Sequence, residues 1–133
     1  MTAGRAALVA MVVLCAFAPR SVAAVPAVAE EEAAYLIVSV ETSGCTFYRN
    51  GSRYDAGRAA AHMREKYALV ATGGAITTGE MFIERVATRS AFTGLAYEVE
   101  CPGSVRLPLA AWLRDVLARY RANGAPRASR GAQ

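Results

Sequence analysis

The chain has 133 residues, of which 54% are hydrophobic and 20% charged, and it carries 15 basic against 11 acidic side chains. This length predicts one domain, and the modest share of charge argues against a wholly disordered chain. Eleven glycines and five prolines without a repeating period exclude a collagen-like chain.

The first segment has the pattern of a secretory signal peptide. Arg5 precedes an apolar run over residues 6–18, and small side chains follow in residues 21–24. A charged start, a short apolar run and small residues are typical of a leader that is removed on export. The run is shorter than the roughly 20 residues of a membrane-spanning helix, so we expect no transmembrane span after cleavage. Residues 1–24 are predicted to be the leader, with an uncleaved anchor as the alternative. The predicted cleavage sites follow Ala23, Ala24 or Ala29.

Charge is uneven along the rest of the chain. Residues 122–133 contain Gly, Pro and Ser and no large apolar side chain, which predicts a disordered tail after a single domain over residues 25–121. The predicted leader and tail each remove two arginines, so the domain is left with 11 basic and 11 acidic residues. A neutral domain lacks the concentrated basic face of a nucleic-acid binder, and we expect no nucleic-acid partner.

Two cysteines, Cys45 and Cys101, remain once the leader is removed. An even pair in an exported chain is usually a disulfide. Closing a loop of 57 residues would stabilise the fold by roughly 4 kcal/mol. A reactive or metal-binding pair is the alternative, but the sequence has no C-x-x-C, and one His with two Cys is a poor set of zinc ligands. We therefore predict a disulfide, no metal and no cofactor.

The first mature element is predicted to be a helix over residues 30–43, with Leu36, Ile37 and Val40 on its apolar face. A strand is the alternative, because residues 35–40 are also β-prone. Residues 45–54 are predicted to form a β-hairpin, since the Asn-Gly pair at its centre suits a type I′ turn.

Further helices are predicted from their capping residues. Asp55 is placed to cap a helix that ends at about Tyr67. Thr77 or Thr78 can cap a third helix that ends at about Thr88.

The last third of the domain combines a strand and a helix. Residues 95–101 alternate as a half-buried strand would, with Leu95, Tyr97, Val99 and Cys101 on one face. Pro108 is a natural first residue for a last helix with a clean apolar stripe. The predicted class is α+β, mainly α: about four helices, a small antiparallel element made of hairpin 45–54 and strand 95–101, and one disulfide.

Three blocks of sequence resemble a known family. They are S-G-C-T-F-Y-R-N-G-S at residues 43–52, A-A-x-H-x-x-x-K-Y at residues 59–67 and Y-x-V-x-C-P-G at residues 97–103. In this order they are similar to a family of small exported proteins of Gram-negative bacteria, known as a domain of unknown function. The resemblance implies export, the Cys45–Cys101 bridge and a single domain, and it supplies no activity. Where family members tend to be basic and polar, residues 68–74 of this chain are mostly apolar.

Two candidate sites follow from residue chemistry. His62 is the only histidine, so acid–base catalysis at neutral pH would involve it. No G-x-S-x-G elbow marks a nucleophile, which favours a histidine bonded at the surface over a catalytic one. The hairpin tip carries Arg49, Asn50, Arg53 and Tyr54, a predicted binding surface for carboxylate or phosphate groups. A solvated hairpin is the alternative.

These features favour a non-catalytic exported domain, periplasmic or secreted, that binds a protein or polymer of the cell envelope. A small hydrolase or lyase that uses His62 is one alternative. A structural protein that associates with itself is the other.

Overall fold

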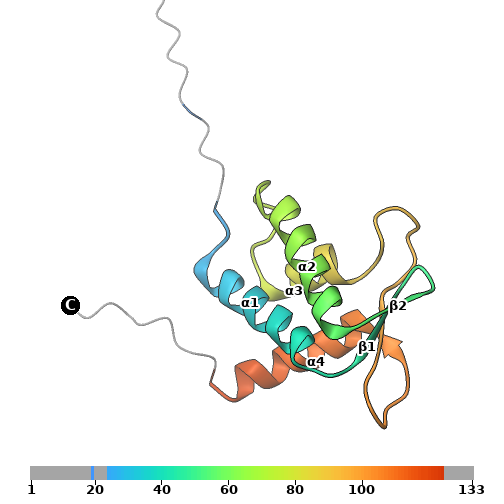
Figure 1. Cartoon of the computed structure of the whole chain (residues 1–133). Coiled ribbons are helices and arrows are strands. Elements are labelled where there is room, and N and C mark those ends of the chain that lie inside the picture. Colours follow the sequence, from blue (N-terminus) through green and yellow to red (C-terminus); the bar gives the residue numbers. More distant parts are fainter. Residues whose placement is uncertain (1–18, 20–23, 125–133) are drawn as a thin grey trace, which may run out of the picture.

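A computed structural model describes Pro19 and residues 24–124 of the chain (Figure 1). Most of the predicted leader and most of the predicted tail lie outside these residues. Among the helices of the described part, none is both long and apolar enough to cross a membrane.

The described residues form four α-helices, one π-helix and four short strands. The helices are α1 (Ala27–Glu41), α2 (Ala56–Ala71), α3 (Gly79–Phe82), the π-helix η1 (Ile83–Ala87) and α4 (Leu109–Ala122). The strands are β1 (Thr46–Arg49), β2 (Ser52–Tyr54), β3 (Glu98–Glu100) and β4 (Leu107–Pro108). The strands pair into one antiparallel sheet in the order β2-β1-β3-β4. This arrangement confirms the predicted α+β, mainly α class.

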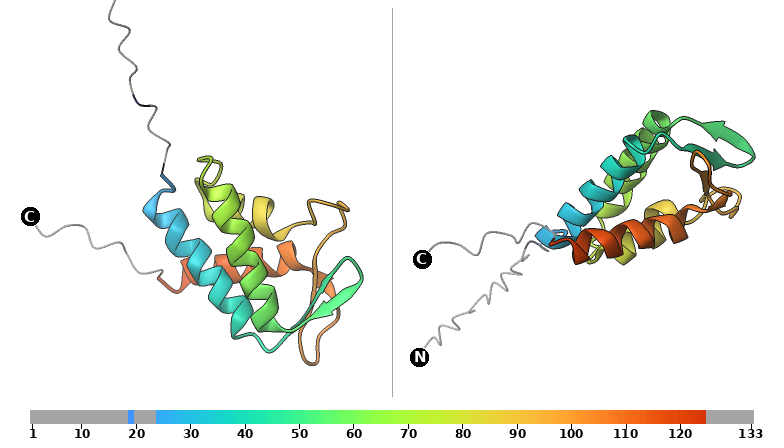
Figure 2. Two further views of the ribbon diagram at one scale, coloured as in Figure 1. Left: turned by 45° about the horizontal axis from the view of Figure 1, so that its top comes forward. Right: turned by 90° about the horizontal axis from the view of Figure 1, so that it is seen from below.

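The helices pack into one body and the sheet lies at one end of it. Figures 1 and 2 show α1 beside α2, with α4 crossing them at an angle. The β1–β2 hairpin projects from the end where α2 begins (Figure 2). The core lies between these elements, because the buried faces of α1, α2, α4 and the sheet belong to one hydrophobic cluster.

The first element is a helix, so the strand alternative is wrong. Leu36, Ile37 and Val40 are buried as predicted, because their helical spacing faces α2 and the remaining core. The helix begins at Ala27, three residues before the predicted start, and ends at Glu41, two residues before the predicted end.

The hairpin forms with its predicted two-residue turn. Asn50 has φ 51° and Gly51 has φ 77°, as a type I′ turn requires. Phe47 lies opposite Tyr54, and Tyr48 lies opposite Arg53. Because side chains alternate along a strand, Phe47 and Tyr54 share the inner face and Arg53 lies on the outer face.

The second helix is capped as predicted. The Asp55 carboxylate accepts a hydrogen bond from the Arg58 backbone N–H at 2.8 Å. The helix ends at Ala71 rather than at Tyr67, since no helix-breaking residue occurs before Gly73 and Gly74.

The third helix starts at the second of its two predicted caps. The Thr78 hydroxyl accepts a hydrogen bond from the Met81 backbone N–H at 3.1 Å. Beyond Phe82 the helix continues as a π-helix to Ala87, close to the predicted end. The Thr88 hydroxyl closes this segment by donating to the Ile83 carbonyl at 2.9 Å.

The predicted strand 95–101 is only partly a strand. Tyr97 and Val99 are buried, but Leu95 is 56% exposed and does not belong to the inner face. The Leu95 carbonyl instead accepts the Ser90 N–H and closes a loop. Only Glu98–Glu100 pairs as a strand, because this loop leaves little extended backbone on its N-terminal side.

The final helix buries its predicted stripe. The buried members are Leu109, Leu113, Val116 and Leu117, and Trp112 and Tyr120 are partly buried against the core. Pro108 precedes the first helical residue instead of being it, and it belongs to the two-residue strand β4.

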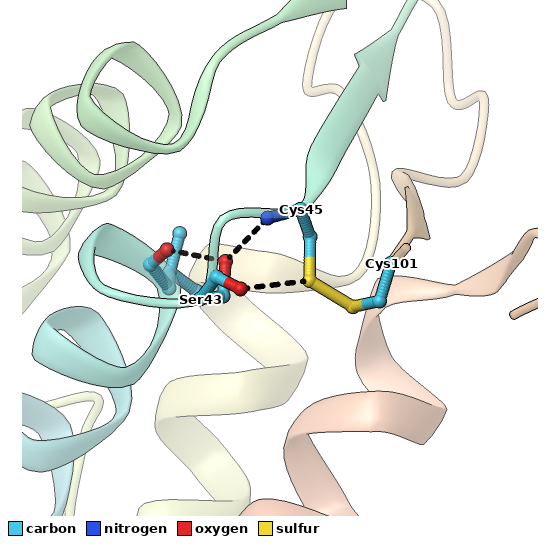
Figure 3. Close-up of a disulfide and its surroundings, with 4 residues drawn as sticks. Ser43, Cys45 and Cys101 are labelled. Atoms are coloured by element: carbon cyan, nitrogen blue, oxygen red, sulfur yellow. Dashed lines mark hydrogen bonds between the residues drawn. A yellow bond between two sulfur atoms is a disulfide. The ribbon is translucent and has the colours of Figure 1, made fainter. Parts of the chain in front are cut away.

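A disulfide joins the two halves of the sheet. Cys45 precedes β1 and Cys101 follows β3, and the paired strands bring their sulfur atoms to 2.00 Å (Figure 3). The Cys45 backbone N–H also donates to the Ser43 hydroxyl at 3.1 Å. The predicted Cys45–Cys101 bridge is therefore confirmed.

Candidate functional site

A pocket of about 40 Å³ lies between the inner face of the hairpin and α2, and we call it the hairpin pocket. Polar groups reach it from three elements of the fold. Arg49 comes from β1 and Tyr54 from β2, and Arg58 and His62 come from α2. Tyr97 closes the pocket from the residue before β3. The fold thus brings two of the predicted binding residues together with the predicted histidine.

The rest of the hairpin-pocket wall is largely apolar. Phe47, Met63 and Leu109 contribute buried side chains from β1, α2 and α4. A polar group in such a wall has little access to water, which strengthens its electrostatic interactions.

Arg49 supplies an unused donor at this site. Its side chain is on the same face of β1 as Phe47, and the residue is half-buried. The Arg49 Nε atom is buried and has no hydrogen-bond partner among the described residues. Buried donors are nearly always bonded in folded proteins, so this atom marks a place where a ligand or water belongs.

His62 and Lys66 meet at the Tyr97 hydroxyl. The His62 Nε2 atom lies 3.5 Å from the Tyr97 oxygen, and Lys66 Nζ donates to that oxygen at 3.3 Å. Lys66 also donates to the Arg89 carbonyl at 2.8 Å. The Tyr97 oxygen accepts from lysine, so its own hydrogen is available for another acceptor.

Burial and positive charge perturb all three groups. Burial, together with the charges of Arg49 and Lys66, lowers the pKa of His62, and Glu65 offsets part of this shift. Burial and the Arg49 charge also lower the pKa of Lys66. Burial raises the pKa of Tyr97, and the charge and hydrogen bond of Arg49 offset part of this rise. At neutral pH the site therefore holds a neutral imidazole beside lysine and arginine cations.

The cations around the hairpin pocket have no carboxylate partners. Among the described residues, neither Arg49, Arg58 nor Lys66 forms an ion pair. Arg58 instead lies over the Tyr54 ring, and Lys66 over the Tyr97 ring. Carboxylates do pair with Arg64, Arg106, Arg114, Arg119 and Arg121 elsewhere in the described fold. Positive charge without a partner is thus left at this pocket.

The predicted tip residues separate into three environments. Arg49 and Tyr54 line the hairpin pocket, whereas Arg53 is exposed on the outer face. The Asn50 side-chain amide donates to the Ser90 hydroxyl, and the Thr93 hydroxyl donates to the Asn50 Oδ1 atom. Asn50 therefore fixes the turn against the loop at residues 90–95, and a binding role for these residues stays a prediction.

The surroundings of His62 do not form a nucleophilic catalytic set. No described serine hydrogen-bonds to its ring: Ser43 serves the Cys45 N–H, and Ser90 bonds to Asn50 and the Phe92 N–H. In the described part of the chain, no three His, Cys, Asp or Glu side chains gather as metal ligands would. What the arrangement can do chemically is hold a negatively charged group.

Sequence reasoning did not assign Arg58, Lys66 or Tyr97 to the site. A signal for two of them was present, because Arg58, His62 and Lys66 are spaced four residues apart and lie on one helix face. Tyr97 offered no such signal, since its place beside His62 depends on strand pairing across the fold.

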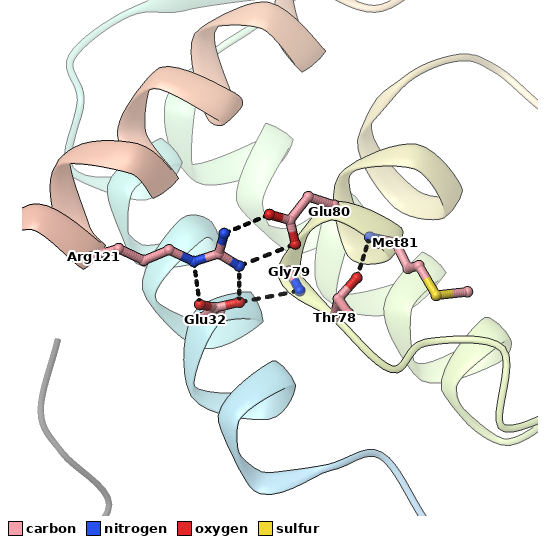
Figure 4. Close-up of polar contacts among 6 residues, drawn as sticks. All are labelled: Glu32, Thr78, Gly79, Glu80, Met81 and Arg121. Carbon is pink, nitrogen blue, oxygen red and sulfur yellow. Dashed lines mark hydrogen bonds and ion pairs between the residues drawn. The ribbon is translucent and has the colours of Figure 1, made fainter.

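A second polar cluster, with the buried Glu32 at its centre, joins three helices (Figure 4). Glu32 of α1 is buried, and its carboxylate accepts from Arg121 Nε at 2.7 Å and Nη2 at 2.9 Å. It also accepts the Gly79 N–H at 3.1 Å. Arg121 donates in addition to Glu80 and lowers the pKa of that carboxyl. The hydrogen-bonding groups of this cluster are paired with one another. We therefore assign the cluster a role in holding the three helices together.

Comparison with known proteins gives one match. The family model described as "Family of unknown function (DUF5329)" matches residues 27–121, almost the whole of the described part. Comparisons with curated proteins and with solved structures found no match.

Proposed function

The chain belongs to this family of unknown function, and we propose that it is an exported, non-catalytic module that binds a protein or another component of the cell envelope. The observation that carries the proposal is the hairpin pocket, where Arg49 and Arg58 have no carboxylate partner among the described residues and the buried Arg49 Nε atom has no hydrogen bond. A buried donor of this kind is best explained by a ligand that accepts its hydrogen bond.

Export is supported by the sequence and by the chemistry of the cysteines. Residues 1–24 have the pattern of a cleavable leader. Disulfides such as Cys45–Cys101 persist in oxidising compartments and are rare in the cytosol. We therefore place the protein in the periplasm or outside the cell.

A binding role fits the site better than catalysis by His62. The nearest polar partner of its ring is the Tyr97 hydroxyl, at a long 3.5 Å, and Lys66 shares that hydroxyl. No described serine is bonded to the histidine, so a triad-like hydrolase lacks its nucleophile here.

Site-specific photo-crosslinking in cells tests this proposal. Arg58 at the rim of the hairpin pocket is replaced by a photo-crosslinking amino acid, and exposed Arg114 on α4 receives the same replacement as a control. We expect the full-length expression product to reach the periplasmic or secreted fraction and to form a discrete crosslinked species from position 58 only. Retention in the cytosol, or equal crosslinking from both positions, would contradict the proposal.

A further inference from the structure

The hairpin pocket supports a narrower statement about its ligand, which rests on the function proposed above. We propose that the pocket binds a carboxylate group, supplied by an acidic side chain or by the terminus of a partner polypeptide. Arg49 is the central donor, with Lys66, Tyr97 and His62 arranged beside it.

The buried Arg49 Nε atom points to an acceptor. A guanidinium presents its N–H groups in a planar fork that matches the two oxygens of a carboxylate. One N–H of this fork is removed from solvent without a partner among the described residues. An acceptor oxygen at that position would satisfy the donor and neutralise a charge that no described carboxylate pairs.

Further donors converge on the same side of α2. The Tyr97 hydroxyl accepts from Lys66 and keeps its hydrogen for an acceptor in the pocket. Of its other neighbours, Arg49 is also a donor, and His62 Nε2 is 3.5 Å away, which leaves that hydrogen only weakly engaged. A ligand oxygen can therefore gain the Tyr97 hydrogen bond without breaking a strong one.

The dimensions of the pocket favour a small planar group. A cavity of about 40 Å³ holds a few non-hydrogen atoms, since about 10–15 Å³ of such volume is enough for one water. The apolar walls formed by Phe47, Met63 and Leu109 suit the hydrocarbon part of an acidic side chain.

The fold favours a carboxylate over a phosphate. Phosphate sites commonly use the free backbone N–H groups at the start of a helix. At the start of α2, the Asp55 carboxylate already accepts the Arg58 N–H and brings its own negative charge. The donors that remain are side chains, led by the Arg49 fork.

Two carboxylates lie near the site but do not occupy it. Glu98 borders the hairpin pocket, yet it is placed between buried Tyr97 and Val99, so strand alternation turns its side chain to the outer face. Glu65 is exposed on α2, and its charge offsets only part of the lowering of the His62 pKa. Neither carboxylate forms an ion pair with Arg49, Arg58 or Lys66.

Nuclear magnetic resonance titrations with defined probes test the inference on the protein expressed from its full sequence. The probes are a short alanine peptide with a free terminal carboxyl, its amidated form, an end-blocked peptide with one Glu, its Gln form, and inorganic phosphate. We expect a carboxyl-bearing peptide to shift the Arg49 Nε–H and the His62 ring signals to saturation. The amidated and Gln forms should leave both signals in place, and the comparison of the two carboxyl peptides identifies the source.

Variants separate the pocket from general surface charge. Arg49→Gln should weaken carboxylate binding about tenfold or more, as loss of a charged hydrogen-bonding partner does. Tyr97→Phe keeps the ring and should weaken binding several-fold, which covers the case in which Arg49→Gln disturbs the fold. Arg85→Gln removes an exposed arginine outside the pocket and should leave affinity unchanged.

Three results would overturn the inference: no shift with either carboxyl peptide, tighter binding of phosphate than of the peptides, or equal weakening by Arg85→Gln and Arg49→Gln. A specific crosslink from position 58 combined with any of them would leave the binding function standing and remove only the carboxylate. Carboxylate binding without export or a crosslinked partner would instead remove the proposed function.

Discussion

Gly79 lies against the Glu32 carboxylate at the start of α3, where the structure has no space for a side chain. A Cβ atom at this position would overlap Glu32 and lie 3.0 Å from a Leu117 methyl carbon. The Gly79 N–H is also one of the donors that satisfy buried Glu32. A single hydrogen atom in place of a methyl group therefore allows α1, α3 and α4 to meet.

Gly79→Ala is accordingly expected to destabilise the fold by about 1–3 kcal/mol, the usual cost of overpacking a core. The matched control is Gly57→Ala on α2, where the added Cβ meets only Asp55 at an ordinary 3.5 Å. The control should be neutral or stabilise by up to about 1 kcal/mol, since alanine favours a helix. Urea unfolding measures both, and equal effects would contradict the close packing at Gly79.

His62 links stability to pH. Its pKa is lowered in the folded protein, so the unfolded chain binds the proton more readily. This contribution to stability is present above the ordinary histidine pKa of about 6.5 and is lost as the pH falls through that value and then through the folded one.

The chain has a single histidine, so pH 7.5 and pH 5 isolate its effect from most carboxyl titration. We expect the free energy of unfolding to fall between these values, and His62→Gln to remove most of the fall. Urea denaturation at both pH values measures this difference. An unchanged pH dependence in the variant would show that His62 is not perturbed by the fold.

The roles of residues that act on close neighbours in the sequence could be predicted. The way in which the site residues come together could be predicted less well. The cap at Asp55 and the turn at Asn50 depend on neighbours within three residues, and both form. The meeting of Arg49, His62 and Tyr97 depends on chain segments far apart in sequence. Composition and spacing identified Arg49 and His62 separately but not their contact.

At the scale of elements, Arg121 joins the end of α4 to α1 and α3 (Figure 4). Its removal would leave the Glu32 carboxylate buried with only the Gly79 N–H as a partner. A buried carboxylate without its cation is costly, although the partly exposed arginine moderates the effect.

Arg121→Met should therefore cost about 1–3 kcal/mol in the free energy of unfolding. Arg119→Met, two residues before Arg121 on α4, removes only a surface pair with Asp115. It should cost no more than about 0.5 kcal/mol. Thermal or chemical unfolding compares the two variants. If Arg121→Met lowered the free energy of unfolding no more than Arg119→Met, the cluster would not hold the helices together.

Most of the helices and strands could be predicted. The differences between the predicted and the observed elements have physical reasons. The apolar stripes of α1 and α4 have helical spacing, which is a strong signal. The two residues of β4 are too few to show any periodicity. Leu95 fits the alternation of a strand, but the loop closed by the Ser90–Leu95 hydrogen bond turns it outward. The π-helix arises in a segment whose apolar residues have the spacing of an ordinary helix.

On the scale of the whole molecule, the disulfide fixes the pairing of β1 with β3 and so the position of the hairpin. Cys45 and Cys101 are 56 residues apart, and the intervening chain contains α2, α3 and the π-helix. The predicted bridge followed from the count of cysteines, whereas the packing of the helices it encloses depends on contacts that no sequence spacing reveals.

Replacing both cysteines by alanine should lower the free energy of unfolding by roughly 4 kcal/mol, through the greater freedom of the unfolded chain. The change is measured by denaturant unfolding, with the unaltered protein under reducing conditions as a matched comparison. The two samples should agree closely. A loss below about 1 kcal/mol in both would mean that this crosslink adds little to the fold.

We propose that the protein leaves the cytosol, loses its leader and carries the Cys45–Cys101 bond in its working state. Mass spectrometry of the protein recovered from the periplasmic or secreted fraction, alkylated with and without prior reduction, tests it most directly. We expect a chain that begins just after Ala23, Ala24 or Ala29 and takes up alkylating reagent at both cysteines only after reduction. An exported chain that still begins at Met1, or one with free thiols before reduction, would contradict it.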